Sequence, residues 1–471
     1  MAPERGGVVA CSDPRASDAG ADVLRGGGNA VDAAVAAALV LFVVEPQSCG
    51  LGGDAFLLHH APGGPVLALD GSGAVPAGLT QGQLEDDGLD KVPGTGGRSV
   101  TVPGAIGLLE AALERHGTLG VADVMAPAVA FARDGFEVRQ TLAVAASRVA
   151  GALRVDPVLG PLYTPDGDPV RLGQSVTNPA LAHVLEELAT AGAAALYGGG
   201  IGVSVADRVQ AAGGYLTLDD LAAHRTEPVQ PESAQFRGRE VWELPLPTQG
   251  PAVLHALREI EAAGPRADWA HVVEAVDAGL QSVGFDVRAI VTSRPPARGD
   301  TTFIAAIDGD GIGASLITSV FGEFGSHLGV EALAGPIHNR AAMFRLTLTP
   351  PRPGKPPHTT IPALATRHGE LELVLGVAGG LAQPQAQVQI LIRMFEEGLA
   401  PQEAIDAPRF KIAFGGDLAL ERGHPLGHRF PDALERDAGQ EGYGAAQVAR
   451  QGEGALDAGA DARRGGAVAF A

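Results

Sequence analysis

A threonine at the start of an expected β-hairpin is the residue in this chain best suited to nucleophilic chemistry. Two apolar runs, 302–307 and 312–320, flank the sequence DGDG at 308–311, and Asp-Gly between such runs is a strong hairpin signal. The preceding segment 293–300, SRPPARGD, is rich in proline and arginine, so we expect it at the surface and outside the sheet. Cleavage after it would free the α-amine of Thr301, which could then act as the base for the threonine's own hydroxyl in acyl transfer.

The expected hairpin register places a second hydroxyl beside this nucleophile. If Gly309 and Asp310 form a two-residue loop, antiparallel pairing sets Thr301 opposite Thr318 and next to Ser319. The hairpin alone does not establish chemistry, because β-branched residues such as threonine commonly begin strands. Other segments must decide between a structural and a catalytic threonine.

A glycine pair after a later strand could stabilise the negative charge that develops during acyl transfer. The apolar run 373–377 leads to Gly379 and Gly380, and a helix is expected over 384–397. Backbone N–H groups of glycines near the positive end of a helix can bind an oxyanion without obstruction by side chains. The alternative is a flexible strand-to-helix connection.

Two more polar positions are candidates for contacts with a substrate. His358 opens the sequence HTT and could act as a general base, although a histidine on a loop is commonly solvated. Arg340 lies in an otherwise apolar segment and could clamp a carboxylate, with a surface arginine as the alternative. No short run of histidine or carboxylate residues suggests a metal site.

Composition favours a globular protein with a small-molecule partner. The 471 residues are 45% hydrophobic and 19% charged, which is typical of a chain with a sizeable core. A formal charge of −21 opposes binding to nucleic acid or to an anionic membrane, and an aromatic content of 4% leaves little for base stacking. The glycine-rich turn at 26–38 lacks the pattern GxGxxG, so no dinucleotide cofactor is expected.

The cysteines and the first residues of the chain indicate the cellular compartment of the protein. Cys11 and Cys49 are too few for a disulfide framework, and we expect both to be small buried residues in a reducing compartment. The first residues lack a cationic patch followed by an apolar signal core. The apolar run 30–44 contains Asp32 and ends at Pro46, so it predicts a buried helix. We therefore expect a cytoplasmic protein without a transmembrane span.

Local patterns predict helices early in the chain and strands later. Asn29 is a suitable N-cap for an alanine-rich helix over 30–44. The other expected elements are a helix over 17–24, strands over 55–60 and 66–70, mostly helix over 105–260 with a strand over 236–244, strands over 360–366 and 371–377, and a weak hairpin or loose chain from 439 onward.

Long sequence blocks resemble the gamma-glutamyltranspeptidase family of N-terminal nucleophile hydrolases. The blocks are GGNAVDAAVAAALVLFVVEPQSCGLGGDAF at 27–56, VPGAIGLLEAALERHG at 102–117, VMAPAVAFARDGFEV at 124–138 and GGYLTLDDLAAHR at 213–225. The resemblance spans nearly the whole chain. It implies an α+β fold, a four-layer αββα sandwich, and it favours a catalytic rather than a structural role for Thr301.

The resemblance also assigns roles to individual residues. It implies a precursor that cleaves itself between Asp300 and Thr301, giving a large segment 1–300 and a small segment 301–471 that associate, with a higher oligomer possible. Thr301 matches the nucleophile, and Ser319 matches the hydroxyl residue that contacts it. The other matched residues are Gly379 and Gly380 as the oxyanion hole, and Thr359 and Thr360 as a pair of hydroxyl residues lining the site.

Two substitutions set this chain apart from family members that act on gamma-glutamyl compounds. Ser72 stands where those proteins hold the substrate carboxylate with an arginine, and Met343 stands where they hold its ammonium with an aspartate. Each lost charge-assisted hydrogen bond is worth about 1.5 to 3 kcal/mol, so a free gamma-glutamyl group should be a poor substrate. The motifs GDTTF and HTTIPAL, with Phe321 in place of an asparagine, resemble the acylase and oxamate-amidohydrolase-like branch instead.

In that branch, Arg340 is our candidate anchor for a substrate carboxylate, with Asn339 and His358 as further substrate contacts. We expect an amide hydrolase that needs no cofactor or metal, forms an acyl-enzyme on Thr301 and passes the acyl group mainly to water. The alternatives are a catalytically silent small-molecule-binding homologue that is not processed, and a true gamma-glutamyltransferase.

Overall fold

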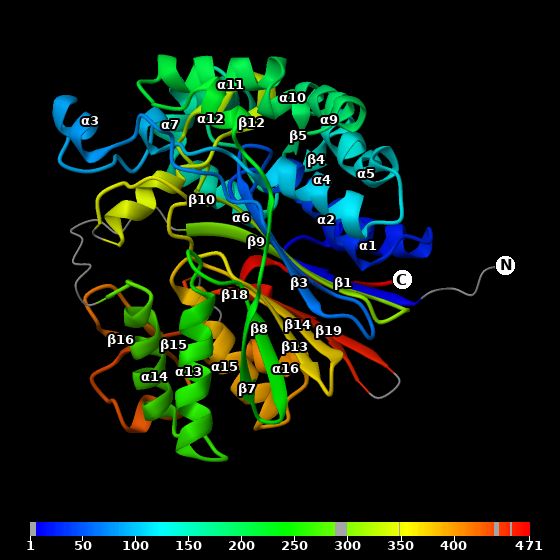
Figure 1. Cartoon of the computed structure of the whole chain (residues 1–471), viewed down its shortest axis with the longest axis vertical. Helices are drawn as coiled ribbons and strands as arrows, with labels where there is room; N and C mark the ends of the chain where they lie inside the picture. The colour runs from blue at the N-terminus through cyan, green and yellow to red at the C-terminus, as the bar shows by residue number, and fades with distance from the viewer. Residues whose placement is uncertain (1–5, 288–298, 348, 438–441, 453–454) are drawn as a thin grey trace.

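Two β-sheets face each other at the centre of the molecule, and helices cover the outer face of each sheet (Figure 1). The computed structural model describes residues 6–287, 299–347, 349–437, 442–452 and 455–471, with only the backbone described at 299–300. Helices, sheet, sheet and helices make the four layers of an αββα sandwich, so the expected fold class is confirmed.

The strands of both large sheets pair with antiparallel neighbours. Among the described residues, the first sheet has seven strands in the order β20-β1-β9-β10-β2-β3-β6, and the second has six in the order β19-β18-β14-β13-β8-β7. The strands of the first sheet are β1 (Gly7–Cys11), β2 (Asp54–His60), β3 (Val66–Asp70), β6 (Glu227–Val229), β9 (Gly299–Asp308), β10 (Gly313–Gly322) and β20 (Ala467–Phe470). Those of the second are β7 (Glu232–Phe236), β8 (Arg239–Glu243), β13 (Pro362–Arg367), β14 (Glu370–Ala378), β18 (Ala445–Gln451) and β19 (Leu456–Ala460).

The helices divide into two groups, one on each sheet. The helices on the side of the first sheet are α1 (Pro14–Arg25), α2 (Ala30–Val44), α3 (Gln81–Asp86), α4 (Ala105–His116), α5 (Val121–Asp134), α6 (Gln140–Arg148), α7 (Ala150–Val155), α8 (Leu159–Tyr163), α9 (Pro179–Ala191), α10 (Ala194–Tyr197), α11 (Gly200–Ala211) and α12 (Leu218–Ala222). Those on the side of the second sheet are α13 (Gly250–Ala263), α14 (Trp269–Ser282), α15 (Ala382–Phe395) and α16 (Pro401–Asp406). Short strand pairs and triplets complete the chain: β4 (Phe136–Glu137) with β5 (Ser175–Val176), β11 (Gly329–Val330) with β12 (Gly335–Pro336), and β15 (Phe410–Ile412) with β16 (Leu418–Glu421) and β17 (Leu434–Arg436).

Helix α2 forms as the sequence predicts. The side chain of Asn29 accepts hydrogen bonds from the N–H groups of Val31 and Asp32, and the Asp32 carboxylate accepts one from the N–H of Asn29. All 15 residues of the helix are buried, because it lies between the strands β9 and β10 and the helix α5. Across the described residues, no helix combines the length and the apolar character that a bilayer crossing requires.

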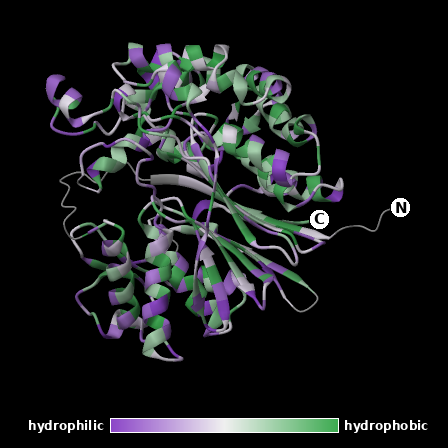
Figure 2. Cartoon of the chain, in the orientation of Figure 1, coloured by the Kyte–Doolittle hydropathy of each residue, from purple (hydrophilic) through white to green (hydrophobic). Residues whose placement is uncertain are grey.

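The largest clusters of apolar side chains fill the spaces between the layers. One includes Leu39 and Ile304 between the first helical layer and its sheet, and another includes Leu254 and Leu375 between the second sheet and its helices. A third cluster, which includes Phe303, lies between the two sheets. Figure 2 shows the hydrophobic colour along strands of the middle layers, whereas α3 at the edge of the first helical layer is largely hydrophilic.

The hairpin of β9 and β10 differs from the expected register by one residue. Its loop has three residues, 309–311, with Gly311 in the left-handed region at φ +82°. Thr302, rather than Thr301, therefore pairs with Thr318. An Asp-Gly sequence is compatible with both loop lengths, because three-residue loops also end on a left-handed glycine.

The segment before the hairpin is also placed differently from the prediction. Gly299 and Asp300 do not leave the sheet but continue β9, pairing with Gly322 and Phe321 of β10. The remainder of the proline- and arginine-rich segment, 293–298, lies outside the described residues.

Two other expectations are corrected by pairings that a local pattern does not reveal. The described part of the chain from residue 442 onward is not loose: β18 and β19 form a hairpin that extends the second sheet, and β20 pairs with β1 at the edge of the first. Most of the expected strand 236–244 forms β8, but its start is wrong, because the chain turns at Arg237 and Gly238 and Phe236 belongs to β7.

The sheets approach each other closely where Phe303 of β9 packs on Gly376 of β14. A Cβ added at Gly376 would lie only 2.3 Å from the Phe303 ring. Farther along the hairpin, a Cβ added at Gly313 would lie 2.4 Å from the side chain of Leu371. The two strands β9 and β14 therefore run in opposite directions across the interface, and the start of β9 lies toward the end of β14.

The substitution Gly376→Ala tests this contact. We expect it to lower the free energy of unfolding by about 1 to 3 kcal/mol, because the methyl group must displace the Phe303 ring or separate the sheets. The control is Gly82→Ala in the exposed helix α3, where an added Cβ meets no atom within 4 Å and alanine favours the helix. Chemical denaturation measures both variants, and an unchanged stability of Gly376→Ala would contradict the close contact.

Candidate active site

Thr301 lies at a bulge in the ladder between β9 and β10. Regular pairing ends at Thr302 and resumes at Asp300, so the single residue Thr301 faces two residues of β10. The Thr301 hydroxyl donates a hydrogen bond to Oγ of Ser319 at 3.2 Å, and both side chains are buried. The bulge thus brings together the two hydroxyl groups that the sequence predicts to be neighbours.

Asp54 of β2 continues this row of polar side chains. Ser319 pairs with Asp54 in the antiparallel ladder, so Thr301, Ser319 and Asp54 lie side by side on three adjacent strands. The residues two positions along these strands pack in the apolar cluster between the sheets: Phe303, Ile317 and Phe56. Because strand side chains alternate between faces, the row of polar side chains also points toward the second sheet.

Asp54 holds two cationic or polar side chains in a buried cluster. Its carboxylate lies 2.9 Å from Nδ1 of His338 and accepts a hydrogen bond from Nε of Arg340 at 3.2 Å, and all three side chains are buried. Burial alone would raise the pKa of Asp54, but His338 and Arg340 outweigh burial and hold that pKa well below its usual range. Asp54 is therefore an anion at the end of the first sheet.

Only one of the three guanidinium nitrogens of Arg340 has a described hydrogen-bond partner within the protein. Its Nη1 and Nη2 atoms are buried and have no hydrogen-bond partner among the described residues. Its guanidinium carbon lies 4.8 Å from the ring centre of Phe321, which adopts a φ of +74°, a strained conformation for a bulky residue. A buried guanidinium with two unpaired nitrogens is suited to bind a carboxylate in two-point fashion. The surface location considered for Arg340 is wrong.

His358 is also buried rather than solvated on its loop. Its ring lies edge-on to Phe56, with the ring centres 4.9 Å apart, and its Nε2 atom has no partner among the described residues. Burial and the positive charge of Arg340 hold the pKa of His358 well below its ordinary value. The neutral ring can exchange a hydrogen bond with a bound molecule, but it is a poor acceptor of a full proton. Thr359 and Thr360 follow it and are buried.

Helix α15 ties the threonine pair to the glycine pair. Gln383 accepts a hydrogen bond from the N–H of Ile361, directly after Thr360, while the N–H of Gln383 itself bonds to the carbonyl of Gly380. Gly379 and Gly380 adopt φ values of +137° and +58°, which other residues adopt only with strain. Since they follow the end of β14, they belong to the same end of the interface as the start of β9.

Three further positions named from the sequence have structural partners. Asn339 uses both ends of its side chain within the protein, accepting from the N–H of Gly322 at 2.9 Å and donating to the carbonyl of Gly94 at 2.7 Å. Ser72 donates to Asp70 at 2.6 Å, and Met343 is buried among apolar side chains. Neither Ser72 nor Met343 supplies a charge to the site.

Sequence reasoning missed Asp54 and His338 as members of this cluster. Asp54 lies within the block 27–56, and an aspartate between glycines and an apolar strand was the available signal. Its partners are more than 280 positions away in the sequence, so their contact is not readable locally. In the part of the chain that the structure describes, no group of three or more histidine, cysteine, aspartate or glutamate residues is arranged to hold a metal ion.

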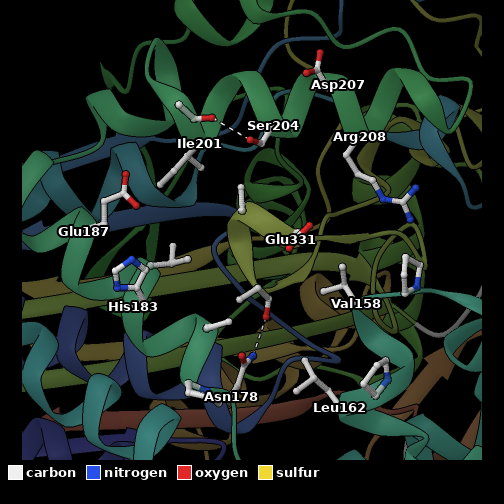
Figure 3. A pocket seen from close by; sticks show the side chains of 18 residues that line it. Val158, Leu162, Asn178, His183, Glu187, Ile201, Ser204, Asp207, Arg208 and Glu331 are labelled. Carbon is white, nitrogen blue, oxygen red and sulfur yellow. Dashed lines mark hydrogen bonds between the residues drawn. The ribbon is translucent and has the colours of Figure 1, made fainter.

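A separate groove lies in the first helical layer, between α9, α11 and the short helix η3 (Glu331–Leu333) (Figure 3). Its volume is about 1270 Å³, and none of the candidate site residues lines it. Asn178 donates to the carbonyl of Ala334 at 2.8 Å and so ties α9 to the segment after η3. The residues that line this groove and are labelled in Figure 3 include Val158, His183, Glu187, Ile201, Asp207 and Glu331.

The four-layer αββα sandwich is the fold of the N-terminal nucleophile hydrolases. The crystal structure of cephalosporin acylase from Bacillus halodurans superimposes with a TM-score of 0.89 at 30% sequence identity, covering 99% of this chain and 96% of that one. The sequence model of the gamma-glutamyltranspeptidase family matches residues 16–283 and 281–471. The chain therefore belongs to the gamma-glutamyltranspeptidase family.

Curated relatives of this chain include hydrolases made as proenzymes. The glutathione hydrolase-like YwrD proenzyme of Bacillus subtilis (strain 168) is 32% identical over 438 residues, which is 84% of this chain and 83% of that protein. The oxamate amidohydrolase proenzyme of Klebsiella pneumoniae is 32% identical over 450 residues, which is 86% of this chain and 85% of that protein. These similarities identify an enzyme of the hydrolase class.

The charge cluster around Asp54 makes a stability prediction. Asp54→Asn leaves the buried guanidinium of Arg340 without its counter-ion, so we expect the free energy of unfolding to fall by about 3 to 5 kcal/mol. Asp268→Asn is the matched control, because Asp268 pairs with Arg429 at the exposed surface and such pairs contribute about 0 to 1 kcal/mol. Denaturant unfolding of the two variants gives the comparison, and losses of equal size would show that Asp54 is not the counter-ion of a buried charge.

Proposed function

We propose that this chain is a self-cleaving amidohydrolase that uses Thr301 as an N-terminal nucleophile and transfers acyl groups mainly to water. The observation that carries the proposal is the buried hydrogen bond between the hydroxyls of Thr301 and Ser319 at the β9–β10 bulge. Membership of a family whose relatives are proenzymes supports it. In this proposal, residues 1–300 form the large segment and residues 301–471 the small one.

Self-cleavage begins with attack of the Thr301 hydroxyl oxygen on the carbonyl carbon of Asp300. The hydroxyl proton passes to the amide nitrogen of Thr301, the peptide C–N bond breaks, and an ester joins the two residues. Water then hydrolyses the ester, leaving a carboxylate on Asp300 and a free α-amine on Thr301. The contact with Ser319 holds the attacking hydroxyl in place on the side of the strand that faces the second sheet.

Amide hydrolysis uses the same oxygen on an external substrate. The α-amine of Thr301 takes the hydroxyl proton as the oxygen attacks the substrate carbonyl, and the backbone N–H groups of Gly379 and Gly380 are the proposed donors to the resulting oxyanion. Collapse of this intermediate breaks the substrate C–N bond, and the leaving amine departs with the proton. Water then hydrolyses the ester on Thr301 and restores the hydroxyl.

Arg340 is the proposed anchor for a carboxylate on the acyl group. Its two unpaired nitrogens are the unsatisfied cationic donors of the cluster, while Asp54 is already engaged by His338 and Arg340. The neutral His358, with Thr359 and Thr360, completes the proposed polar lining, and Asn339 supports it by fixing the end of β10. Acyl groups with a carboxylate and no ammonium fit these charges better than gamma-glutamyl groups.

Thr301→Ala tests the nucleophile. We expect this variant to remain one uncut chain without amide hydrolase activity, because both proposed reactions need the hydroxyl oxygen. Thr302→Val is the matched neighbour: the Thr302 hydroxyl is buried without a partner among the described residues, so its loss should leave cleavage and activity intact. Denaturing electrophoresis and an amide-hydrolysis assay report both effects. A Thr301→Ala protein that is cut and active would exclude the proposal, and an uncut, inactive parent protein would favour a silent binding homologue.

Arg340→Met tests the carboxylate anchor. The kcat/KM for the p-nitroanilide of glutaric acid, divided by that for the p-nitroanilide of pentanoic acid, isolates the contribution of the carboxylate within one variant. We expect this ratio to fall about 10- to 100-fold, because a charge-assisted hydrogen bond contributes about 1.5 to 3 kcal/mol. Arg340→Lys should retain part of the preference. An unchanged ratio in Arg340→Met would show that the anchor lies elsewhere.

A further inference from the structure

Arg464 reaches the backbone of the proposed nucleophile from the edge of the first sheet. Its Nη1 atom donates a hydrogen bond to the carbonyl oxygen of Thr301 at 3.3 Å. Arg464 is half-buried and ends the short helix η6 (Ala462–Arg464), immediately before β20. The proposed amide hydrolysis assigns no role to Arg464.

The sheet register explains why this side chain can reach Thr301. Ala10 of β1 pairs with Ala305 of β9 on one side and with Val468 of β20 on the other. Four residues before Ala305 is Thr301, and four residues before Val468 is Arg464, so the two occupy equivalent positions on the outer strands. Strand β1 ends at Cys11 and the chain then enters α1, so β1 does not extend between Thr301 and Arg464.

A buried ionic network fixes η6 in this position. Asp461 accepts a hydrogen bond from the N–H of Arg463 at 2.9 Å and pairs with Arg409 at 2.8 Å, while Arg463 pairs with Glu421 at 2.6 Å. These four side chains are almost fully buried. The backbone that carries Arg464 is therefore held in place by this network.

We infer that Arg464 is a positioning residue that keeps the freed α-amine of Thr301 unprotonated and so able to act as a base. The inference rests on the proposed function. A cation bonded to the carbonyl of the same residue lies a few ångströms from that amine and disfavours a second positive charge there. An ordinary amino-terminal amine is half protonated at about pH 7.7 to 8.0, so even a modest effect raises the fraction of competent base at neutral pH.

Several other charged or titratable groups lie near this position. Asp54 is paired with His338 and Arg340 in the row beside Thr301, and His358 is held neutral by burial and by the charge of Arg340. Beside η6, Asp13 pairs with Arg15 at 2.6 Å and lies 3.6 Å from Arg139, which also bonds to the carbonyl of Gly465. Arg464 is the cation whose described hydrogen bond goes to Thr301 itself.

The pH dependence of kcat/KM in the mature enzyme tests the inference. In Arg464→Met, which keeps the aliphatic stem but removes the charge, we expect the acid limb to move to higher pH by about 0.5 to 1 unit, with the plateau at high pH retained. At a fixed pH on that limb, kcat/KM should fall about 3- to 10-fold. Arg464→Lys should restore the position of the parent limb, because it restores the charge. Arg171→Met, at an exposed pair with Asp168, is the matched loss of one charge and should leave the profile unchanged.

Two outcomes would overturn the inference. One is an Arg464→Met profile that coincides with the parent profile, and the other is an Arg464→Lys profile that is shifted as far as that of Arg464→Met. If Arg464→Met is not cleaved, Arg464→Gln, which keeps a neutral hydrogen-bond donor, replaces it in the pH measurement. If Arg464→Lys is not cleaved, the inference is also overturned. Activity that persists in Thr301→Ala would instead refute the proposed function, so the two failures are distinguishable.

Discussion

The one-residue bulge between β9 and β10 is the constraint on which the geometry of the candidate site depends. It sets Thr301 against two residues of β10, so that its hydroxyl meets Ser319, and it lets β9 continue through Asp300. It also coincides with the left-handed conformation of Phe321, whose ring supports the guanidinium of Arg340. Strained backbone of this kind costs of order 1 to 3 kcal/mol and persists where surrounding structure enforces it.

In the proposed function, the buried guanidinium next to the bulge serves to bind an anionic substrate group. Asp54 satisfies one nitrogen of Arg340 and leaves the other two without partners among the described residues. Burial of a guanidinium with two unpaired nitrogens is unfavourable unless an anion binds to it, because buried polar groups without partners have lost their hydration. The same cluster holds His358 neutral, which separates the role of binding from that of proton transfer. The freed amine of Thr301 then remains the base in the proposed reaction.

Some of this structure could be predicted from the sequence, and the reasons for the failures are physical. The helix after Asn29, the layered α+β fold and the proximity of Thr301 to Ser319 follow from capping, from the hairpin pattern and from long blocks that resemble the family. The hairpin register does not, because DGDG fits loops of two or three residues. The strand near Phe470 pairs with one near Val8, and Asp54 meets His338, so their interactions depend on the assembled fold.

The identity of the first residue of the small segment tests the central claim most directly. Mass spectrometry and amino-terminal sequencing of the purified, unmodified protein determine it. The account predicts two tightly associated fragments, the smaller beginning Thr-Thr-Phe-Ile at Thr301. A fully active preparation that consists of one continuous chain, or a smaller fragment that begins at another residue, would contradict it.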